Sequence, residues 1–176
     1  MGDCIISVLV IGKYEHVIGI DMCLTARAVG ASEIIFTGKK DAKMVRYVNN
    51  LEKTWGGRFK ISFVKNYKEA LDSATKYMKV YLTRYGIPLQ KLSYQLNTYK
   101  NIMLIVSSDK ASSPTLHKLA DFNVSITEQP HCGCAAIAIF LHDFYRGREL
   151  AMHFENARYR VVPKEHGIAV EKIEER

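Results

Sequence analysis

The stretch DFNVSITEQPHCGCAAIAIFLHDFYRG, residues 121–147, changes character twice and indicates how the C-terminal half of the chain is built. It opens with a strand-like run over residues 122–126 and then crosses a polar turn that ends at Gln129-Pro130-His131. Beyond Gly133 the residues become small and apolar, and this pattern favours a long helix reaching about Met152. A buried strand, a polar loop and a helix in this order are typical of an α/β protein.

The same alternation runs through the rest of the chain. Asp41 is a good N-cap for one helix, and Gly86 is expected to cut off the fourth strand. We expect strands at residues 5–10, 33–37, 59–64, 80–83 and 102–106, and helices at residues 22–29, 41–53, 67–77 and 89–99, with a short helix opening at Ser113-Pro114. The sequence therefore predicts a single domain over residues 1–176, an α/β fold with a mainly parallel sheet flanked by helices. Residues 158–171 are expected to add a C-terminal β-hairpin with glycine in its turn.

Composition narrows the class of protein. Hydrophobic residues make up 48% of the 176-residue chain, and no apolar run approaches the roughly 20 residues that a membrane span needs. The N-terminal residues lack a basic leader and a small-residue cleavage site, so we expect a cytoplasmic protein without membrane attachment. Cys132 and Cys134 are too close together for the usual zinc knuckle, and we expect no metal site and no disulfide framework.

Charge points to an anionic partner. The net charge is +7, and the segment between Asp72 and Asp109 contains no acidic residue. Cations and tyrosines alternate in that segment: Lys76, Lys79, Arg84, Lys91 and Lys100 with Tyr77, Tyr81, Tyr85, Tyr94 and Tyr99. Cations for phosphates beside rings for bases are how proteins hold single-stranded or looped RNA. The alternative is a solvated basic face whose tyrosines pack inward.

Three loops late in the chain are candidates for a ligand site, because ligands of open α/β sheets bind beyond the carboxyl ends of the strands. They are residues 83–86, 107–111 and 127–134, and all are rich in small or hydrogen-bonding residues. No GxGxxG motif follows the first strand and no GxxxxGK[ST] motif occurs, so the sequence does not favour a dinucleotide or nucleoside triphosphate site. The loops could instead line a slot for a flat, largely neutral ligand such as an adenosyl group, or be ordinary turns.

Several short motifs resemble one family in order and spacing. They are LTARAVGA (24–31), WGGRF (55–59), LTRYG (82–86), LADFNVSI (119–126) with QPH (129–131), and VVP (161–163). Together the chain resembles, from about Val8 to Val170, the archaeal tRNA cytidine-56 2'-O-methyltransferases, of the SPOUT class of knotted methyltransferases.

The resemblance implies a C-terminal trefoil knot, a homodimer with the active site near its interface, and S-adenosylmethionine as methyl donor. The substrate would be the ribose 2'-hydroxyl of the T-loop cytidine of tRNA, so the protein would be a tRNA ribose 2'-O-methyltransferase. By matching position, the cofactor slot would include Leu82, Ser107, Ser108, Asp109, Lys110, Ala111, Ile126, Thr127, Glu128, Gln129, Pro130, His131, Cys132 and Gly133. Small Ala135 and Ala136 would let the following helix start close against the ligand or the threaded chain.

Methyl transfer to a ribose hydroxyl needs positioning and a group that accepts the proton or steadies the developing alkoxide. Arg27 is the first catalytic candidate, as a stabiliser of negative charge, and a solvent-facing helix arginine is the alternative. His131 is the second; it could contact cofactor or ribose, or be a structural loop residue that caps the next helix. Arg84, Lys91 and Lys13 are expected to contact RNA.

Departures from the family pattern keep other functions open. Relatives tend to carry Gly at Ser107, Asn at Glu128 and His at Asp21, and a longer loop in place of Lys13-Tyr14-Glu15-His16. These changes make a catalytically impaired, knot-fold RNA-binding protein the main alternative. A Cys-His hydrolase using Cys132 and His131 is a further alternative, although adjacent residues seldom aim at each other across one backbone unit.

Overall fold

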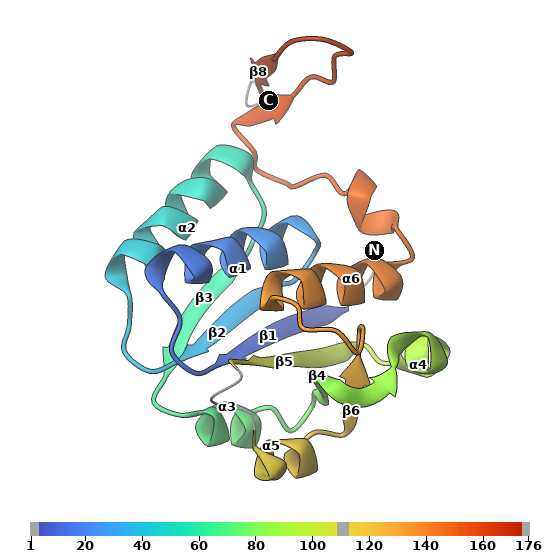
Figure 1. Cartoon of the computed structure of the whole chain (residues 1–176). Helices are drawn as coiled ribbons and strands as arrows, with labels where there is room; N and C mark the ends of the chain where they lie inside the picture. The colour runs from blue at the N-terminus through green and yellow to red at the C-terminus, as the bar shows by residue number, and fades with distance from the viewer. Residues whose placement is uncertain (1–3, 109–112, 174–176) are drawn as a thin grey trace.

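The centre of the protein is a parallel sheet with the strand order β3-β2-β1-β5-β4-β6 (Figure 1). The computed structural model describes residues 4–108 and 113–173. The strands of this sheet are β1 (Ile5–Ile11), β2 (Glu33–Thr37), β3 (Lys60–Val64), β4 (Met78–Pro88), β5 (Asn101–Ser107) and β6 (Phe122–Ser125). The α-helices are α1 (His16–Ala28), α2 (Ala42–Trp55), α3 (Tyr67–Ser73), α4 (Leu89–Leu96), α5 (Pro114–Leu119) and α6 (Gly133–Tyr145), and the 3-10 helix η2 spans Arg148–Ala151.

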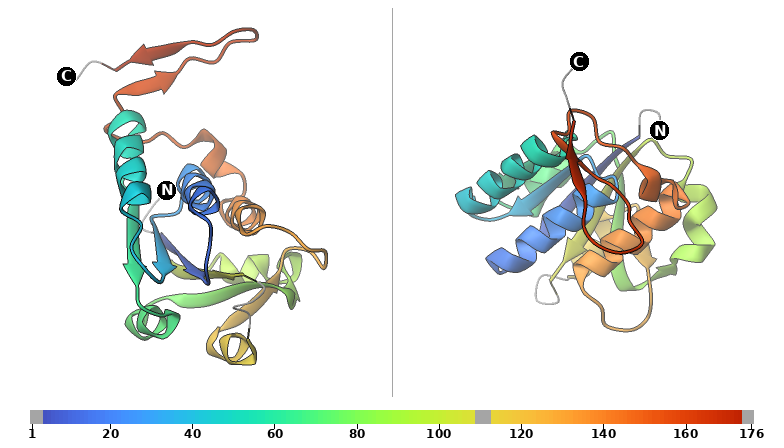
Figure 2. Two further views of the ribbon diagram at one scale, coloured as in Figure 1. Left: turned by 60° about the vertical axis from the view of Figure 1, so that its left-hand side comes forward. Right: turned by 90° about the horizontal axis from the view of Figure 1, so that it is seen from above.

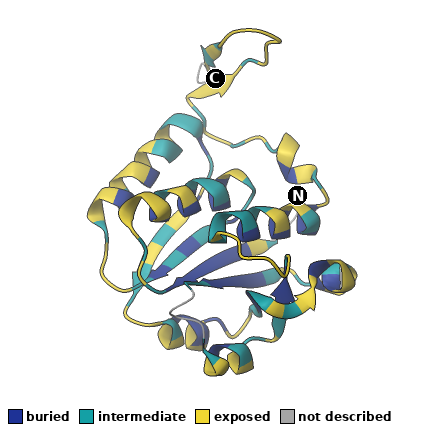
Figure 3. Cartoon of the chain, in the orientation of Figure 1, coloured by how far each residue is buried: buried dark blue, intermediate teal, exposed yellow. Residues whose placement is uncertain are grey.

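Helices cover both faces of the sheet, as a parallel sheet requires. Side chains of β1 point alternately to the two faces of the sheet. Ile6 and Val8 pack with α1, α2, α4 and α6 on one face, and Leu9 and Ile11 pack with α3 and α5 on the other. Figure 2 shows the resulting three layers, and Figure 3 shows the burial of the central strands between them. The predicted α/β class and parallel sheet are confirmed.

The C-terminal strands stand apart from this body. β7 (Tyr159–Val161) and β8 (Val170–Lys172) pair antiparallel and project beyond the C-terminal end of α2 (Figures 1 and 2). Their residues are mostly exposed (Figure 3). The turn between them includes Gly167, whose φ of 95° lies in the left-handed region that favours glycine.

Several predicted boundaries were wrong. The helix predicted from Met22 begins six residues earlier, at His16, and the helix predicted to reach Tyr77 ends at Ser73. The helix predicted to reach about Met152 ends at Tyr145, because Arg146 and Gly147 adopt left-handed φ angles of 55° and 74°. By contrast Asp41 caps α2 as predicted, since its carboxylate accepts hydrogen bonds from the backbone N–H groups of Lys43 and Met44.

The fourth strand differs most from its prediction and shapes the site. We expected it to stop before Gly86, but β4 continues to Pro88. Its pairing with β6 is interrupted: both Leu82 and Ile87 lie opposite Val124, so the four residues between them bulge out of the ladder. The bulge closes at Gly86, where a Cβ atom would lie 2.5 Å from the backbone of Val124, so no larger residue fits without moving a strand.

Candidate functional site

A cavity of about 210 Å³ lies at the bulge of β4 and the carboxyl end of β5. This is the edge of a parallel sheet at which ligands of α/β proteins bind. Its walls come from the bulge of β4, the end of β5 and the loop that leads into α6. The lining residues are Tyr81, Leu82, Thr83, Arg84, Tyr85, Val106, Ser107, Pro130, His131, Cys132, Gly133 and Ala136.

The wall between β4 and β5 is held by one side-chain contact. The Tyr81 hydroxyl and Ser107 Oγ are 2.6 Å apart, and Tyr81 is only 1% exposed. The Tyr81 and His117 rings pack in a T-shaped arrangement with their centroids 4.9 Å apart, which links this wall to α5. The Ser107 hydroxyl is therefore held in position by a buried tyrosine.

The opposite wall is the loop from β6 to α6, which organises its own polar groups. His131 Nδ1 lies 2.8 Å from the backbone oxygen of Gln129. A carbonyl oxygen only accepts hydrogen bonds, so Nδ1 carries the proton, and in the neutral ring Nε2 is the basic nitrogen. Cys132 Sγ accepts a hydrogen bond from the backbone N–H of Ala135 at 3.4 Å, so Cys132, and not His131, caps α6.

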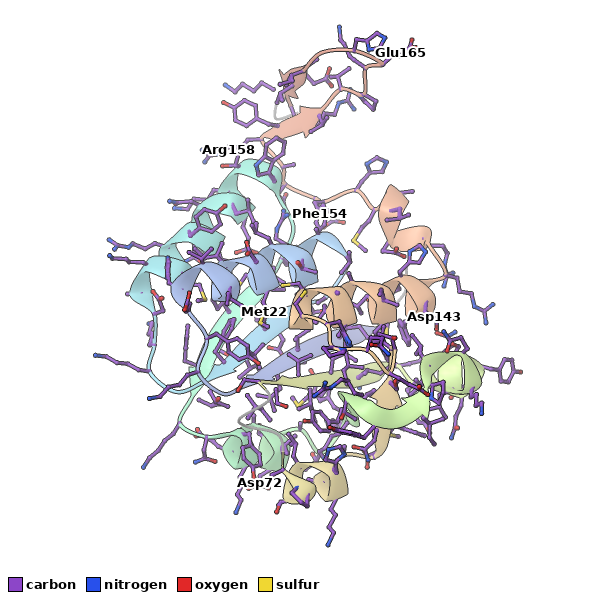
Figure 4. The ribbon with its side chains drawn as sticks, in the orientation of Figure 1. Met22, Asp72, Asp143, Phe154, Arg158 and Glu165 are labelled. Atoms are coloured by element: carbon purple, nitrogen blue, oxygen red, sulfur yellow. The ribbon has the colours of Figure 1, made fainter. Side chains whose placement is uncertain are left out.

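The loop also crosses the end of the sheet. β6 is an edge strand, whereas α6 starts beside α1 near the sheet centre: a Cβ on Gly133 would lie 2.6 Å from the Cε of Met22. Figure 4 shows Met22 on α1 next to the start of α6. Small residues at the start of α6 thus allow the helix to lie close to α1 and to the cavity. Ala136 lines the cavity, whereas Ala135 does not.

The cavity unites part of the predicted cofactor slot. Leu82, Ser107 and the run from Pro130 to Gly133 line it. Five predicted residues lie beside these stretches but not in the lining: Ser108, Ile126, Thr127, Glu128 and Gln129. Three others, Asp109, Lys110 and Ala111, lie outside the described residues.

Sequence reasoning missed some of the lining. Tyr81 and Val106 are strand residues one position before predicted slot residues, so counting one residue back from each loop would have found them. Ala136 follows the lining residue Gly133 by three positions, which places both on one face of α6. Thr83 and Tyr85 belong to a loop that was predicted as a candidate, without an assigned role.

Arg27 occupies a different environment. It is only 7% exposed, so the solvent-facing alternative is wrong, and it does not line the cavity. Its Nη2 donates hydrogen bonds to the backbone oxygens of Trp55 at 3.2 Å and Gly56 at 2.6 Å. The guanidinium carbon lies 4.5 Å from the centroid of the Phe154 ring. Burial lowers the pKa of Arg27, while Glu52 opposes that shift, and an arginine remains charged in this setting.

The three predicted RNA contacts lie on the surface near the carboxyl edge of the sheet or on α4. Arg84 lines the cavity, with its guanidinium carbon 5.7 Å from the Tyr85 ring centroid. Lys13 follows β1, and Lys91 is on α4, and both are exposed. The tyrosines of the acid-free segment divide: Tyr85 and Tyr94 are 77% and 84% exposed, whereas Tyr81 is buried. The inward-packing alternative is therefore correct for Tyr81, whereas RNA binding by the exposed Tyr85 and Tyr94 stays a prediction.

The described residues do not show the side-chain arrangements that a metal site or a Cys-His hydrolase would need. Among residues 4–108 and 113–173, no three His, Cys, Asp or Glu side chains gather as a metal site would require. Hydrogen bonds direct His131 and Cys132 to backbone groups of Gln129 and Ala135, so neither bond joins the pair that a Cys-His hydrolase would use. In the part of the chain that the structure describes, no helix has the length and apolar character to cross a membrane.

Solved structures similar to this one include methyltransferases and a tRNA modifying enzyme. The SpoU methyltransferase AviRb from Streptomyces viridochromogenes, solved in complex with the cofactor AdoMet, matches with a TM-score of 0.60 and 19% identity over 83% of this chain and 58% of that longer chain. The A. aeolicus TrmH/SpoU tRNA modifying enzyme matches with a TM-score of 0.56 and 17% identity over 86% of this chain and 78% of that one. At these identities the likeness shows the fold alone: the chain has the α/β fold of SpoU methyltransferases.

Proteins with related sequences share a higher identity with this chain than the solved structures do. The tRNA (cytidine(56)-2'-O)-methyltransferase of Methanopyrus kandleri is 36% identical over 154 residues, which cover 86% of each chain. The protein of the same name from Pyrococcus horikoshii is 34% identical over 157 residues, covering 87% of this chain and 76% of that one. The sequence profile described as tRNA ribose 2'-O-methyltransferase, aTrm56, matches residues 55–171. On this likeness of sequence along most of its length, the chain belongs to the tRNA ribose 2'-O-methyltransferase family.

Proposed function

We propose that the protein transfers a methyl group from S-adenosylmethionine to the ribose 2'-hydroxyl of cytidine-56 in tRNA. The observation that carries the proposal is the meeting of Leu82, Ser107 and residues 130–133 in one cavity, on a chain of this family. We place this reaction in the cytoplasm, where the protein would encounter its tRNA substrate.

The lining suits an adenosyl group. Leu82, Val106 and Ala136 offer apolar surface to a flat ring, and the hydroxyl and backbone groups of residues 83 and 130–133 offer hydrogen bonds at its edges. When bound, S-adenosylmethionine supplies an electrophilic methyl group on a sulfonium. The chain's own contribution is to hold the ribose hydroxyl in line with that methyl group and to exclude competing water.

His131 is the group that we assign to the proton of the ribose hydroxyl. Its Nδ1 is committed to the backbone oxygen of Gln129, so Nε2 is the nitrogen that can accept a proton at the mouth of the cavity. Arg84 lies in the same lining and would hold a phosphate of the substrate strand, because its planar fork suits phosphate oxygens. Lys13 and Lys91 would add further phosphate contacts.

Arg27 has a narrower role in this proposal. Within one chain its guanidinium is committed to the end of α2 and the Phe154 ring, so a direct role in catalysis would require substrate or a second protomer to approach that region. We therefore treat Arg27 first as a structural residue, and its catalytic role stays a prediction.

We also propose the trefoil knot and the homodimer of the family. The knot is supported by the path of residues 126–132, which pass from the edge strand β6 across the ends of β4 and β5 to α6. The dimer is supported by exposed apolar residues on adjacent helices, Val17 and Ile18 of α1 and Ile139 of α6, which would be covered by a partner.

Labelled methyl transfer to an unmodified tRNA transcript tests the proposal, with two variants of α6 as a matched pair. Ala136→Leu would fill the cavity and should weaken cofactor binding at least tenfold and reduce transfer with it. Ala138→Leu adds the same volume on the same helix outside the lining and should leave both unchanged. Ala136→Val, which adds less volume, should give an intermediate loss. Equal behaviour of the folded Ala136 and Ala138 variants would remove the cavity from the reaction.

A further inference from the structure

A second depression in the surface lies at the opposite edge of the sheet. This open groove of about 1620 Å³ runs between the C-terminal end of α2, the start of β3 and the base of the β7–β8 hairpin. Figure 4 shows Arg158 where the hairpin leaves the body, with Glu165 at its far end. Strand β3 begins here, whereas the cofactor cavity lies at the carboxyl ends of the strands. The two sites therefore face different ends of the molecule.

The groove is strongly basic. Its lining contains five cations, all exposed: Lys53, Arg58, Lys60, Arg158 and Lys172. Within residues 4–108 and 113–173, no carboxylate lies within 4.0 Å of any of them. The one carboxylate of the lining, Glu52, is committed to the backbone N–H of Phe59. The acidic residues Glu174 and Glu175 that follow lie outside the described residues. Five cations against one carboxylate thus leave a net positive charge along this concave surface.

The shape of the groove is set by backbone contacts. The Gly57 N–H donates to the Glu155 oxygen at 2.7 Å, and the Arg158 N–H donates to the Thr54 oxygen at 3.0 Å, so both walls are joined at the floor. Gly56 has a φ of 71°, and a Cβ there would lie 2.4 Å from the Glu155 oxygen, so only glycine permits this approach. The Arg27 guanidinium stacks on the Phe154 ring and donates a hydrogen bond to the Gly56 oxygen, so it also holds the end of α2 near the segment that leads to the hairpin.

We propose that this groove binds the sugar–phosphate backbone of the substrate RNA at a place remote from the methylated nucleotide. The inference rests on the proposed function. Exposed, unpaired cations in a preformed channel suit phosphates, which position an RNA without reading its sequence. The Tyr159 ring, 39% exposed in the lining, can stack on a base or ribose. A folded tRNA is extended, so one molecule can reach two separated surfaces of the enzyme. Recognition of the whole tRNA would then depend on the groove, and chemistry on the cavity.

The test compares two double charge reversals in the full chain. Lys53→Glu with Arg158→Glu alters the groove. Lys65→Glu with Lys68→Glu alters exposed residues just beyond the other end of β3, and is the control. Each pair lowers the formal net charge from +7 by four, to +3, so long-range charge effects are matched. The binding probes are an unmodified full-length tRNA transcript and an isolated T-arm hairpin that contains the target cytidine.

The groove variant should bind full-length tRNA at least tenfold more weakly than the control, with the slope of log affinity against log salt smaller by roughly 1.5. Its affinity for the T-arm hairpin and for S-adenosylmethionine should match the control within about twofold. In methyl transfer its KM for tRNA should rise, whereas kcat at saturating tRNA should stay near the control value.

Equal weakening in the groove and control variants, or equal loss with the T-arm hairpin, would overturn the proposal. Lys53→Gln with Arg158→Gln provides a milder pair if the reversal impairs folding, and should give a smaller loss in the same direction. If the wild-type protein bound tRNA but transferred no methyl group, the proposed function would fail, and the binding comparison would still decide the role of the groove.

Discussion

The Tyr81 hydroxyl and Ser107 Oγ lie 2.6 Å apart and join β4, just before its bulge, to the carboxyl end of β5 on one wall of the cavity. Tyr81 is buried, and its ring forms a T-shaped pair with His117 of α5, so the hydroxyl has little freedom. The pair gives Ser107 a fixed orientation in the wall of the cavity.

Tyr81→Phe removes this contact without changing the packing volume much. We expect a loss of about 1 kcal/mol in the free energy of unfolding, and about fivefold weaker binding of S-adenosylmethionine, because the Ser107 side chain loses its orientation. Urea denaturation and calorimetric titration measure the two effects. Tyr94→Phe, at an 84% exposed site on α4, is the control and should change neither. If Tyr81→Phe behaves like the control, the contact does not organise the cavity.

Arg27→Ala should lower the free energy of unfolding by about 2–4 kcal/mol. The variant leaves the Gly56 and Trp55 oxygens without their charged donor, and removes the cation from the Phe154 ring. Arg27→Lys should recover only part of the loss, because a single ammonium group lacks the planar fork. Arg46→Ala, at an exposed position on α2, should change stability by less than about 0.5 kcal/mol.

A stability change in Arg27→Ala as small as in Arg46→Ala would contradict this structural role. The catalytic prediction for Arg27 is tested separately, under conditions in which the variant is folded and saturated with cofactor. A roughly 10²-fold fall in single-turnover methyl transfer would support it, whereas a rate near wild type would confine Arg27 to the junction of α1, α2 and the hairpin.

His131→Ala should reduce single-turnover methyl transfer by roughly 10²-fold or more, because Nε2 would no longer accept the ribose proton. Affinity for S-adenosylmethionine should change much less, since the backbone groups of residues 130–133 remain. His153→Ala, at an exposed position outside the cavity lining, is the matched control. Retention of the wild-type rate by His131→Ala would leave positioning alone as the source of catalysis.

The cysteines should differ in reactivity. Cys132 is exposed and lines the cavity, whereas burial, with a smaller effect of Cys134, raises the pKa of Cys23 to about 12. A thiol with a raised pKa stays protonated and unreactive as long as the pH is below that value, and only the thiolate is alkylated. At pH 8, iodoacetamide should therefore modify Cys132 first and leave Cys23 unmodified in the folded protein. Mass spectrometry of digested protein locates the modified thiol.

S-adenosylmethionine should slow the alkylation of Cys132, because the bound cofactor would cover the cavity. Cys132→Ser should remove the fast-reacting thiol and show which signal belongs to it. An alkylation rate that is the same with and without saturating cofactor would place the cofactor elsewhere.

The fold class was predictable from the sequence because the alternation of apolar strands with helices is a local pattern. The N-cap at Asp41 was predictable for the same reason, since its carboxylate binds backbone two and three residues away. The course of β4 was not, because Gly86 usually ends a strand. Here it instead allows contact with β6, whose backbone is about forty residues later in the chain. The end of α6 depended on the left-handed conformation of Arg146, which its residue type does not favour.

The candidate site was predictable in part for a related reason. The loops after late strands must meet at one edge of a parallel sheet, and this placed Ser107 and His131 together. The surroundings of Arg27 were not predictable, because its partners come from the end of α2 and from Phe154, far along the chain. The basic groove was missed because its cations are distributed over residues 53–60 and 158–172 and come together only through the backbone contacts at the hairpin base.

The central claim is that the methyl group goes to the 2'-hydroxyl of cytidine-56. The most direct test is transfer of labelled methyl from S-adenosylmethionine to two tRNAs that differ only at that nucleotide, one with cytidine and one with 2'-deoxycytidine. We predict stoichiometric transfer to the first, recovered as 2'-O-methylcytidine after nuclease digestion, and none to the second. Equal labelling of both tRNAs, label on a base, or binding of tRNA and cofactor without any transfer would contradict the account.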